Sequence, residues 1–461
     1  MDAASRGTSY VYGIERHTLC LASLTGDTSN NRFALGTLGI TEPGEIHVVD
    51  FRSDENTLQS TVYNHTSGVR ALASTPWDPS HLLVVNCGRT SASSNETTTT
   101  TTGSPTSSSS LSVLAGAAVE LVALSSDQEH GPENETQRIA LLQPAAHTES
   151  SQYHQHQQRP VPPHAVVCHP ATHSKRAAVV STASVTIWDL SHQSEDRPAP
   201  IFTVSASTQP MTIIDDIGTA AWHPTNTNQF STTDSTCIRT WDTRVDVHKA
   251  QGPVTMATAV DCAHSAKIRA LNYNPNLPYI LASGGDDGAV RIWDLRNPAT
   301  ALLELTNHSH WVYSVEFNPN HDQLLLSAGS DGLVNLESAV SVSSAHVVAG
   351  IGGRHSDPDA STSRRHQQAS ALDNIADKPR ASDAEHTHGA EENSDSDSDT
   401  DDNEGAQRPA DGLVAQFDDH ETSVYAAHWS AADPWLFASL SFDGRMVINF
   451  VPREEKYKIL L

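Results

Sequence analysis

The sequence has 461 residues, of which 37% are hydrophobic and 6% aromatic, and its 28 basic and 55 acidic residues give a net charge of −27. A chain of this length needs several domains or a repeat architecture, and its low apolar content indicates that part of it does not pack. The acidic balance argues against a general electrostatic grip on nucleic acid or anionic lipid. Because it has no long apolar run, secretory leader or closely spaced cysteines, we expect a cytoplasmic chain without a membrane span, disulfide framework or zinc site.

Antiparallel strands are predicted along most of the chain, in units that resemble one another. In residues 262–296, apolar and polar residues alternate over Ile268–Tyr273, Tyr279–Ser283 and Ala289–Trp293, and Asn-Pro and Asp-Gly turn signals separate these runs. Alternation with a period of two and such punctuation is typical of antiparallel strands. The unit recurs with varying fidelity in seven segments: 10–51, 66–86 with 111–124, 164–190, 217–244, 262–296, 307–338 and 419–450.

Three of these units end in Trp-Asp. Trp188, Trp241 and Trp293 are 53 and 52 residues apart, and an Asp follows each of them. Four strands per unit with this ending are the signature of WD repeats, so the sequence predicts an all-β, seven-bladed β-propeller. One blade cannot bury both faces of its sheet, and only a closed ring covers them all. Either a strand near Tyr10–Ile14 or the terminal Tyr457–Leu461 is expected to close the ring.

Three segments have compositions that do not support packing. Residues 90–112 contain seventeen Ser or Thr, and we expect a disordered insert there. Residues 146–163 are rich in His, Gln and Pro without metal-ligand spacing, and we expect a solvated loop. Residues 349–412, whose run 391–404 has eight acids and no base, are expected to form an acidic disordered loop between the last two blades.

The acidic segment also bears on regulation and on domain boundaries. Ser394, Ser396 and Ser398 each precede an acid, which makes them candidate phosphorylation sites. Since the single repeat after this segment cannot form a core alone, we expect residues 8–348 and 413–461 to form one propeller domain.

A histidine, a serine and an aspartate recur at matched offsets in three units. These are the residue types of a base, a nucleophile and an orienting acid, but repetition in three units favours a structural network over catalysis. The indole N–H of Trp293 completes the first network, whereas Glu337 and Asn449 stand at that position in the later two. We therefore expect no enzyme activity and no cofactor. The network residues are His264, Ser283, Asp287 and Trp293, then His308, Ser327 and Asp331, and finally His420, Ser439 and Asp443.

The start of the innermost strand is the predicted partner-binding position in each unit. Residues three and five after each matched histidine should lie there, around the central channel. Exposed aromatic and cationic side chains at these places are of the types that anchor protein interfaces, although Trp311 packed between two blades is the alternative. The candidates are Lys267, Arg269, Trp311, Tyr313 and Tyr425.

The C-terminal half and the start of the chain carry motifs that are specific to one family. Residues 308–344 include WVYSVEFNP and GLVNLES, where Glu-Ser replaces Trp-Asp, and residues 420–461 end in VPREEKYKILL. YGIE (12–15), FALGT (33–37) and IHVVDF (46–51) stand near the start. With the acidic segment before the last unit, these motifs resemble the family of EARP- and GARP-interacting WD-repeat proteins.

The resemblance implies a non-enzymatic adaptor that binds the EARP and GARP vesicle-tethering complexes. It implies support for their membrane recruitment, endosomal recycling and endosome-to-trans-Golgi transport, with a peripheral location at the trans-Golgi network and recycling endosomes. The expected partners are tethering-complex subunits, with no nucleic acid, and the chain is expected to be monomeric by itself.

A rival function rests on two short motifs. Trp241–Arg244 and Trp293–Arg296 match the WDxR pattern of substrate receptors of cullin-4 ubiquitin ligases, in which Arg244 and Arg296 would meet the ligase adaptor. The plain alternative is a strand end with a solvated arginine. A propeller that binds histones or peroxisomal cargo shares the fold, and fold alone does not carry function.

Overall fold

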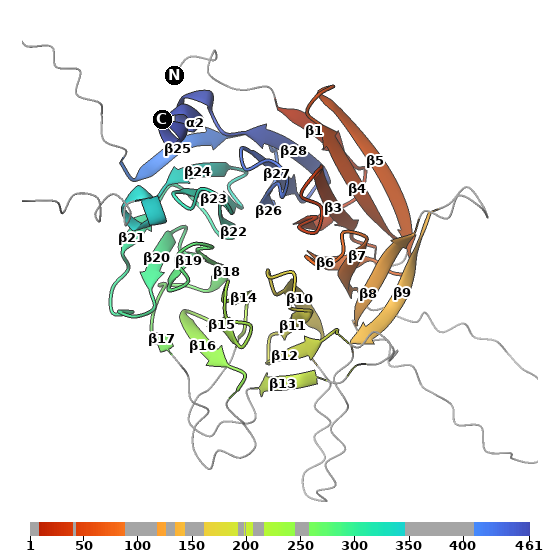
Figure 1. Ribbon diagram of the computed structural model, residues 1–461, viewed down its shortest axis with the longest axis horizontal. Helices are drawn as coiled ribbons and strands as arrows, with labels where there is room; N and C mark the ends of the chain where they lie inside the picture. Colours follow the sequence, from red (N-terminus) through yellow and green to blue (C-terminus); the bar gives the residue numbers. More distant parts are fainter. Residues whose placement is uncertain are drawn as a thin grey trace, which may run out of the picture. The chain divides into compact units, whose positions relative to one another are not determined.

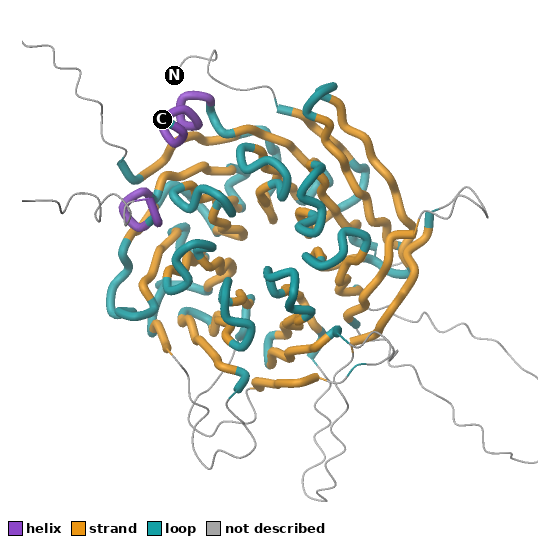
Figure 2. The backbone as a smooth tube through the Cα atoms, viewed as in Figure 1, coloured by secondary structure: helices purple, strands orange, loops and turns teal. Residues whose placement is uncertain are grey.

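The computed structural model describes residues 9–39, 43–87, 118–125, 134–142, 161–191, 198, 200–205, 216–244, 258–345 and 410–461. These residues belong to one compact unit, in which Figure 1 and Figure 2 show sheets side by side in a ring. Strands dominate, accompanied by a 3-10 turn, η2 (Val340–Val342), and an α-helix, α2 (Arg453–Leu460). No helix in these ranges is long and apolar enough to cross a membrane.

Five sheets in the described ranges have four antiparallel strands each. Two of them, given from the centre of the ring outward, are β10 (Pro163–Cys168), β11 (Arg176–Ser181), β12 (Ser184–Asp189) and β13 (Pro200–Ser205), then β14 (Ala220–Trp222), β15 (Gln229–Asp234), β16 (Cys237–Asp242) and β17 (Thr258–Val260). Two more are β18 (Ile268–Tyr273), β19 (Ile280–Gly285), β20 (Val290–Asp294) and β21 (Leu303–Leu305), then β22 (Val312–Phe317), β23 (Leu324–Gly329), β24 (Val334–Ser338) and β25 (Gly412–Phe417). The last is β26 (Val424–Trp429), β27 (Leu436–Ser441), β28 (Arg445–Phe450) and β1 (Tyr10–Gly13).

A sixth sheet has eight strands and divides into two halves. One half is β2 (Thr18–Ser23), β3 (Asn31–Thr37), β4 (Gly44–Arg52) and β5 (Thr57–His65), and the other is β6 (Val69–Ser74), β7 (His81–Asn86), β8 (Val119–Ser125) and β9 (Glu135–Leu142). The outer strands β5 and β9 join the halves through one parallel pair, Asn64 with Glu135. The chain is thus an all-β propeller, as the sequence predicts. The count of seven blades stays a prediction, which this division into two four-stranded halves supports.

The strands form where the sequence alternates. The predicted strand over Ile268–Tyr273 coincides with β18, and its two successors in that unit lie within two residues of β19 and β20. In three sheets the second strand is buried along its whole length. These strands are β19, β23 and β27, and neighbouring sheets cover both of their faces.

The apolar core lies between neighbouring sheets. Each buried cluster draws side chains from two adjacent four-stranded groups, such as Val180 with Phe230, or Leu281 with Ile238. Leu35 and Phe33 of the first group pack in the same way with Leu436 of the last. Stacking around the ring therefore buries what a single sheet leaves exposed.

The N-terminal strand closes the ring. Strand β1 pairs antiparallel with β28, from Tyr10 opposite Ile448 to Gly13 opposite Arg445. Of the two expected closures, the one near Tyr10–Ile14 is found, and Tyr457 lies in helix α2 instead. The first predicted unit is corrected accordingly, since its first strand belongs to the last sheet.

The expected acidic loop falls outside the described residues except at 410–412. The chain on its two sides belongs to one sheet, because β25 pairs with β24 from Phe417 opposite Val334 onward. Residues 346–409 thus connect the third and fourth strands of that sheet, so the expected position of the loop, between the last two blades, is corrected to one within a single sheet.

Replacing Tyr10 with alanine tests the closure. Its ring lies 4.8 Å from that of Phe51 and 6.3 Å from that of Phe450, centroid to centroid, so it packs between the two ends of the chain. We expect the free energy of unfolding to fall by about 2 kcal/mol in urea titrations. Val11→Ala, on the opposite and exposed face of β1, should change it by less than about 0.5 kcal/mol. Equal losses in the two variants would contradict this pairing.

Candidate functional site

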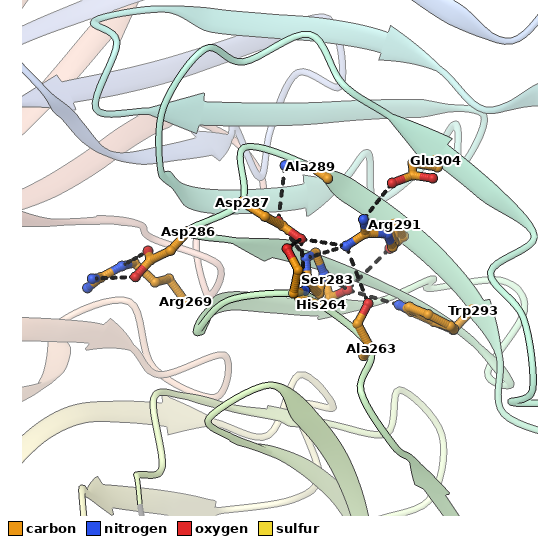
Figure 3. Close-up of polar contacts among 11 residues, drawn as sticks. Ala263, His264, Arg269, Ser283, Asp286, Asp287, Ala289, Arg291, Trp293 and Glu304 are labelled. Carbon is orange, nitrogen blue, oxygen red and sulfur yellow. Dashed lines mark hydrogen bonds and ion pairs between the residues drawn. The ribbon is translucent and has the colours of Figure 1, made fainter.

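The four residues of the first predicted network lie in contact with one another (Figure 3). Nε2 of His264 lies 2.8 Å from Oγ of Ser283, and Nδ1 lies 2.9 Å from Oδ1 of Asp287. The indole Nε1 of Trp293 donates to the same Oγ at 2.9 Å. Burial is the main cause that lowers the pKa of His264, while the hydrogen bonds of Asp287 to Arg291 and His264 outweigh its burial and lower its pKa. The four side chains tie the start of the inner strand to the turn between β19 and β20.

The second network repeats this geometry with a different end. His308 bonds Ser327 at 2.9 Å through Nε2 and lies 3.0 Å from Asp331 through Nδ1. Glu337, which replaces the tryptophan, accepts a hydrogen bond from Asn307 at 3.0 Å through Oε1, while its Oε2 is buried without a partner. A fully buried carboxyl with one bare oxygen is costly to ionise, and burial raises the pKa of Glu337.

The third network departs from the predicted contacts. His420 bonds Ser439 at 2.7 Å, but its Nδ1 contacts Oγ of Ser441 at 2.8 Å instead of Asp443. Ser441 in turn donates to Asp443 at 2.6 Å. In the first network the equivalent position is Gly285, where an added Cβ would lie 2.6 Å from Nδ1 of His264. In the third network the hydroxyl of Ser441 takes the place of the aspartate beside His420 and connects the histidine to Asp443.

These networks are not built to react with a substrate. The three histidines are 3–8% exposed and the three serines are fully buried, so an outside molecule has no access to them. Asn449 ends the third network with a 3.3 Å hydrogen bond to Asp419. A buried, hydrogen-bonded relay of this kind fixes strand register. Within the described ranges, no group of His, Cys, Asp or Glu is arranged to hold a metal ion.

The predicted binding residues lie where the inner strands begin. Figure 1 places β18, β22 and β26 next to the centre of the ring. The register of each slips after its first residue, so Arg269, Tyr313 and Tyr425 are the extra residues of β-bulges. Bulges re-aim side chains away from the sheet. The same slip occurs at Leu19, Arg70 and His164, which sequence reasoning missed.

The structure brings the predicted aromatic residues together. Trp311 and Tyr313 form an edge-on pair at 6.3 Å, and Tyr313 stacks on Tyr425 at 4.5 Å, centroid to centroid. Trp311 is 39% exposed, so it is not packed away between two sheets. Burial, with Tyr425 beside it, raises the pKa of Tyr313 to about 12, which keeps its hydroxyl neutral.

Two further rings extend this set, and the sequence analysis missed both. Phe442, in the turn between β27 and β28, lies 5.9 Å from Tyr425, and His17, just before β2, stacks on Phe442 at 4.5 Å. We call Trp311, Tyr313, Tyr425, Phe442 and His17 the aromatic row. It crosses three neighbouring four-stranded groups, including the closure between the two ends of the chain.

The two predicted cations are both bound by carboxylates, and only Arg269 also contacts the row. The guanidinium of Arg269 forms a two-pronged ion pair with Asp286 and lies over the rings of Trp311 and Tyr313, at 4.7 and 5.3 Å. Lys267 is bound by Asp216 at 2.5 Å. Both positive charges are thus compensated, and the guanidinium of Arg269 packs against the rings of Trp311 and Tyr313.

Both WDxR arginines are bound by their own motifs. Nη2 of Arg244 lies 2.5 Å from Asp242, and that of Arg296 lies 2.7 Å from Asp294. Arg296 also stacks on Tyr279 at 3.5 Å. Their side chains are 65% and 64% exposed. The candidate phosphorylation sites Ser394, Ser396 and Ser398 lie outside the described residues.

Comparison with known proteins places this architecture in a family. Residues 208–336 match the EIPR1 beta-propeller, and residues 412–448 match the WD domain, G-beta repeat. The chain is 30% identical to the EARP and GARP complex-interacting protein 1 of Homo sapiens and 31% identical to the EARP-interacting protein homolog of Danio rerio, over 98% of each chain. It is 33% identical to the EARP-interacting protein 1 of Caenorhabditis elegans over 43% of each chain.

The chain belongs to the EARP- and GARP-complex-interacting protein family. The resemblance drawn from the sequence is thereby confirmed. The two segments that match family descriptions also carry most of the aromatic row, since Trp311 and Tyr313 lie in the first and Tyr425 and Phe442 in the second. His17 lies outside both, although the full-length relatives of this family span it.

The buried carboxyl of Glu337 predicts a pH-dependent loss of stability. Because its pKa is raised on folding, the folded chain holds this proton more tightly than the unfolded chain. Its contribution is fully present below the unfolded pKa near 4.5 and is lost as the pH rises through the folded pKa. We expect Glu337→Gln to remove this loss, so that its free energy of unfolding relative to the native chain rises as the pH increases above 4.5.

Urea titrations at several pH values check this, with the exposed Glu135→Gln as the control. If the difference in free energy of unfolding between Glu337→Gln and the native chain is the same at every pH, ionisation of this carboxyl does not destabilise the fold.

Proposed function

We propose that this chain is a non-enzymatic WD-repeat adaptor that binds the EARP and GARP vesicle-tethering complexes. Its relatives are named for interaction with these complexes. In this proposal the chain supports membrane recruitment of the complexes, endosomal recycling and endosome-to-trans-Golgi transport. It would be a cytoplasmic monomer, held peripherally at the trans-Golgi network and recycling endosomes by its partners.

The observation that carries the proposal is the aromatic row. A contiguous patch of exposed rings is typical of an interaction site, and the row includes Trp311 and Phe442, which are 39% and 36% exposed. Tyr and Trp anchor interfaces because they bury much area with few rotatable bonds. Neighbouring rings and Arg269 already hold the side chains of Trp311 and Tyr313 in place. Binding of a partner would therefore cost little conformational entropy at these two side chains.

The proposal also covers boundaries that the structure describes only at their ends, where Pro163 lies in β10 and Gly412 in β25. We retain one propeller formed by residues 8–348 and 413–461, with inserts at 90–112, 146–163 and 349–412. Phosphorylation at Ser394, Ser396 and Ser398 would add charge to an already acidic segment and is a candidate means of regulation.

Removing the two central anchors should abolish capture of the complexes. We expect the double variant Trp311→Ala and Tyr313→Ala to lose at least tenfold in affinity for purified EARP complex, since each anchor contributes about 1–2 kcal/mol at an interface. Far-ultraviolet circular dichroism and the unfolding midpoint should stay close to those of the native chain.

The matched control replaces two exposed apolar residues away from the row, Ile201 in β13 and Leu302 just before β21. Ile201 and Leu302 are 49% and 48% exposed, and changing both to alanine should leave EARP binding unchanged. If the Trp311 and Tyr313 variant is folded and binds EARP as tightly as the control does, the row is not the binding site.

The rival reading as a cullin-4 substrate receptor makes the opposite prediction for Arg244 and Arg296. Both are exposed and paired at the surface with their own aspartates, so changing them to alanine should leave folding and EARP binding intact. A substrate receptor would lose the ligase adaptor in this variant, because a charged hydrogen bond contributes about 1.5–3 kcal/mol. Affinity purification that recovers the adaptor without any tethering subunit, and loses it in the variant, would overturn our proposal.

A further inference from the structure

The aromatic row ends at a pocket. A pocket of about 290 Å³ is lined by Glu15, Arg16, His17, Leu38, Gly39 and Asp443. His17 belongs to both features, because it lines the pocket and stacks on Phe442 with an interplanar angle of 11°. The row and the pocket are therefore one continuous surface.

The pocket carries two carboxylates to which no cation among the described residues is bound. Glu15 is exposed, and no ion pair or hydrogen bond of its side chain occurs within the described ranges. Asp443 accepts hydrogen bonds from the neutral hydroxyls of Thr422 and Ser441. The one cation in the lining, Arg16, is already bound to Glu45 at 3.3 Å and to the carbonyl oxygen of Pro43 at 3.2 Å. Among the described residues, the pocket thus presents two carboxylates without a bound cation beside the ring of His17.

The spacing of the rings in the aromatic row fits a helical partner better than an extended one. Its successive ring centroids are 6.3, 4.5, 5.9 and 4.5 Å apart. These values bracket the 5.4 Å pitch of an α-helix. Same-face side chains of an extended strand recur at about 6.6 Å, which is longer than every one of these separations.

We propose that the partner element on this surface is an amphipathic α-helix of about four turns from a tethering-complex subunit. Its apolar stripe covers Trp311, Tyr313, Tyr425 and Phe442, one turn to each ring, and a lysine or arginine at the end of that stripe enters the pocket. There Glu15 and Asp443 meet its charge. The inference rests on the proposed function and adds the chemistry of the partner.

Charge complementarity favours this occupant over an acidic or uncharged segment. The pocket end of the row has no free cation among the described residues, so an acidic partner would be repelled there. A second copy of this chain offers helix α2, which has only eight residues and so is about half the required length.

A charge reversal at Glu15 tests the basic side chain. Glu15 makes no contact that the fold needs, so Glu15→Lys should fold normally and weaken binding of purified EARP complex at least tenfold, with a smaller salt dependence than the native chain. The control is Asp54→Lys, an exposed acid in the turn between β4 and β5, at the opposite end of its sheet from His17. Asp54→Lys should bind like the native chain. Unchanged affinity of Glu15→Lys would overturn the proposed basic contact.

Photo-crosslinking tests the helix. p-Benzoylphenylalanine placed singly at Tyr313, Tyr425 and Phe442 should crosslink to one EARP subunit, at sites that advance by three or four residues from one position to the next. Sites that advance by two residues, or that scatter over several segments or fall on a second copy of this chain, would overturn the helix.

The two levels of the proposal fail in different ways. If the native chain does not bind EARP or GARP, the proposed function is wrong. If it binds, and binding depends on Trp311 and Tyr313 but not on Glu15 or on helical crosslink spacing, only the further inference is wrong.

Discussion

The pairing of strand β1 with strand β28 is the constraint on which the rest of this structure depends. It joins residues 10–13 to residues 445–448 and leaves no open side in the ring of sheets. An open ring would expose the apolar faces of its first and last sheets, which here are buried together in a cluster that includes Phe33 and Leu436. The ends of the chain therefore stabilise one another, in addition to the stacking of neighbours along the ring.

The same closure creates the candidate site. His17 comes from the first group of strands and Phe442 from the last, and they stack only because β1 brings those groups together. The buried histidine networks act at a shorter range, since each fixes the start of an inner strand and so the bulge residue that follows. The fold and the candidate site are thus linked. Buried polar networks fix the register of the inner strands, and the aromatic side chains that begin these strands form a surface that is ordered before binding.

Local patterns in the sequence predict local structure well. Alternation and turn residues locate β18 to β20 within two residues, and repeat offsets identify Trp311, Tyr313 and Tyr425 as neighbours around the channel. Contacts between distant repeats were beyond such reasoning, because no offset within a unit relates His17 to Phe442. The bridging role of Ser441 was readable in principle, since a serine stands where the other two networks have glycine. The sequence offered both Tyr10–Ile14 and Tyr457–Leu461 as the strand that closes the ring, and only the observed pairing of β1 with β28 decides between them.

A cryo-electron microscopy reconstruction of this chain bound to the EARP complex tests the central claim most directly. The account predicts that a partner helix lies along the aromatic row, from Trp311 to His17, and crosses the junction between the first and last groups of strands. It also predicts a basic side chain in the pocket of Glu15 and Asp443. A partner seated on the outer strands, or on the ends of β16 and β20 at Arg244 and Arg296, with the row left bare, would contradict it.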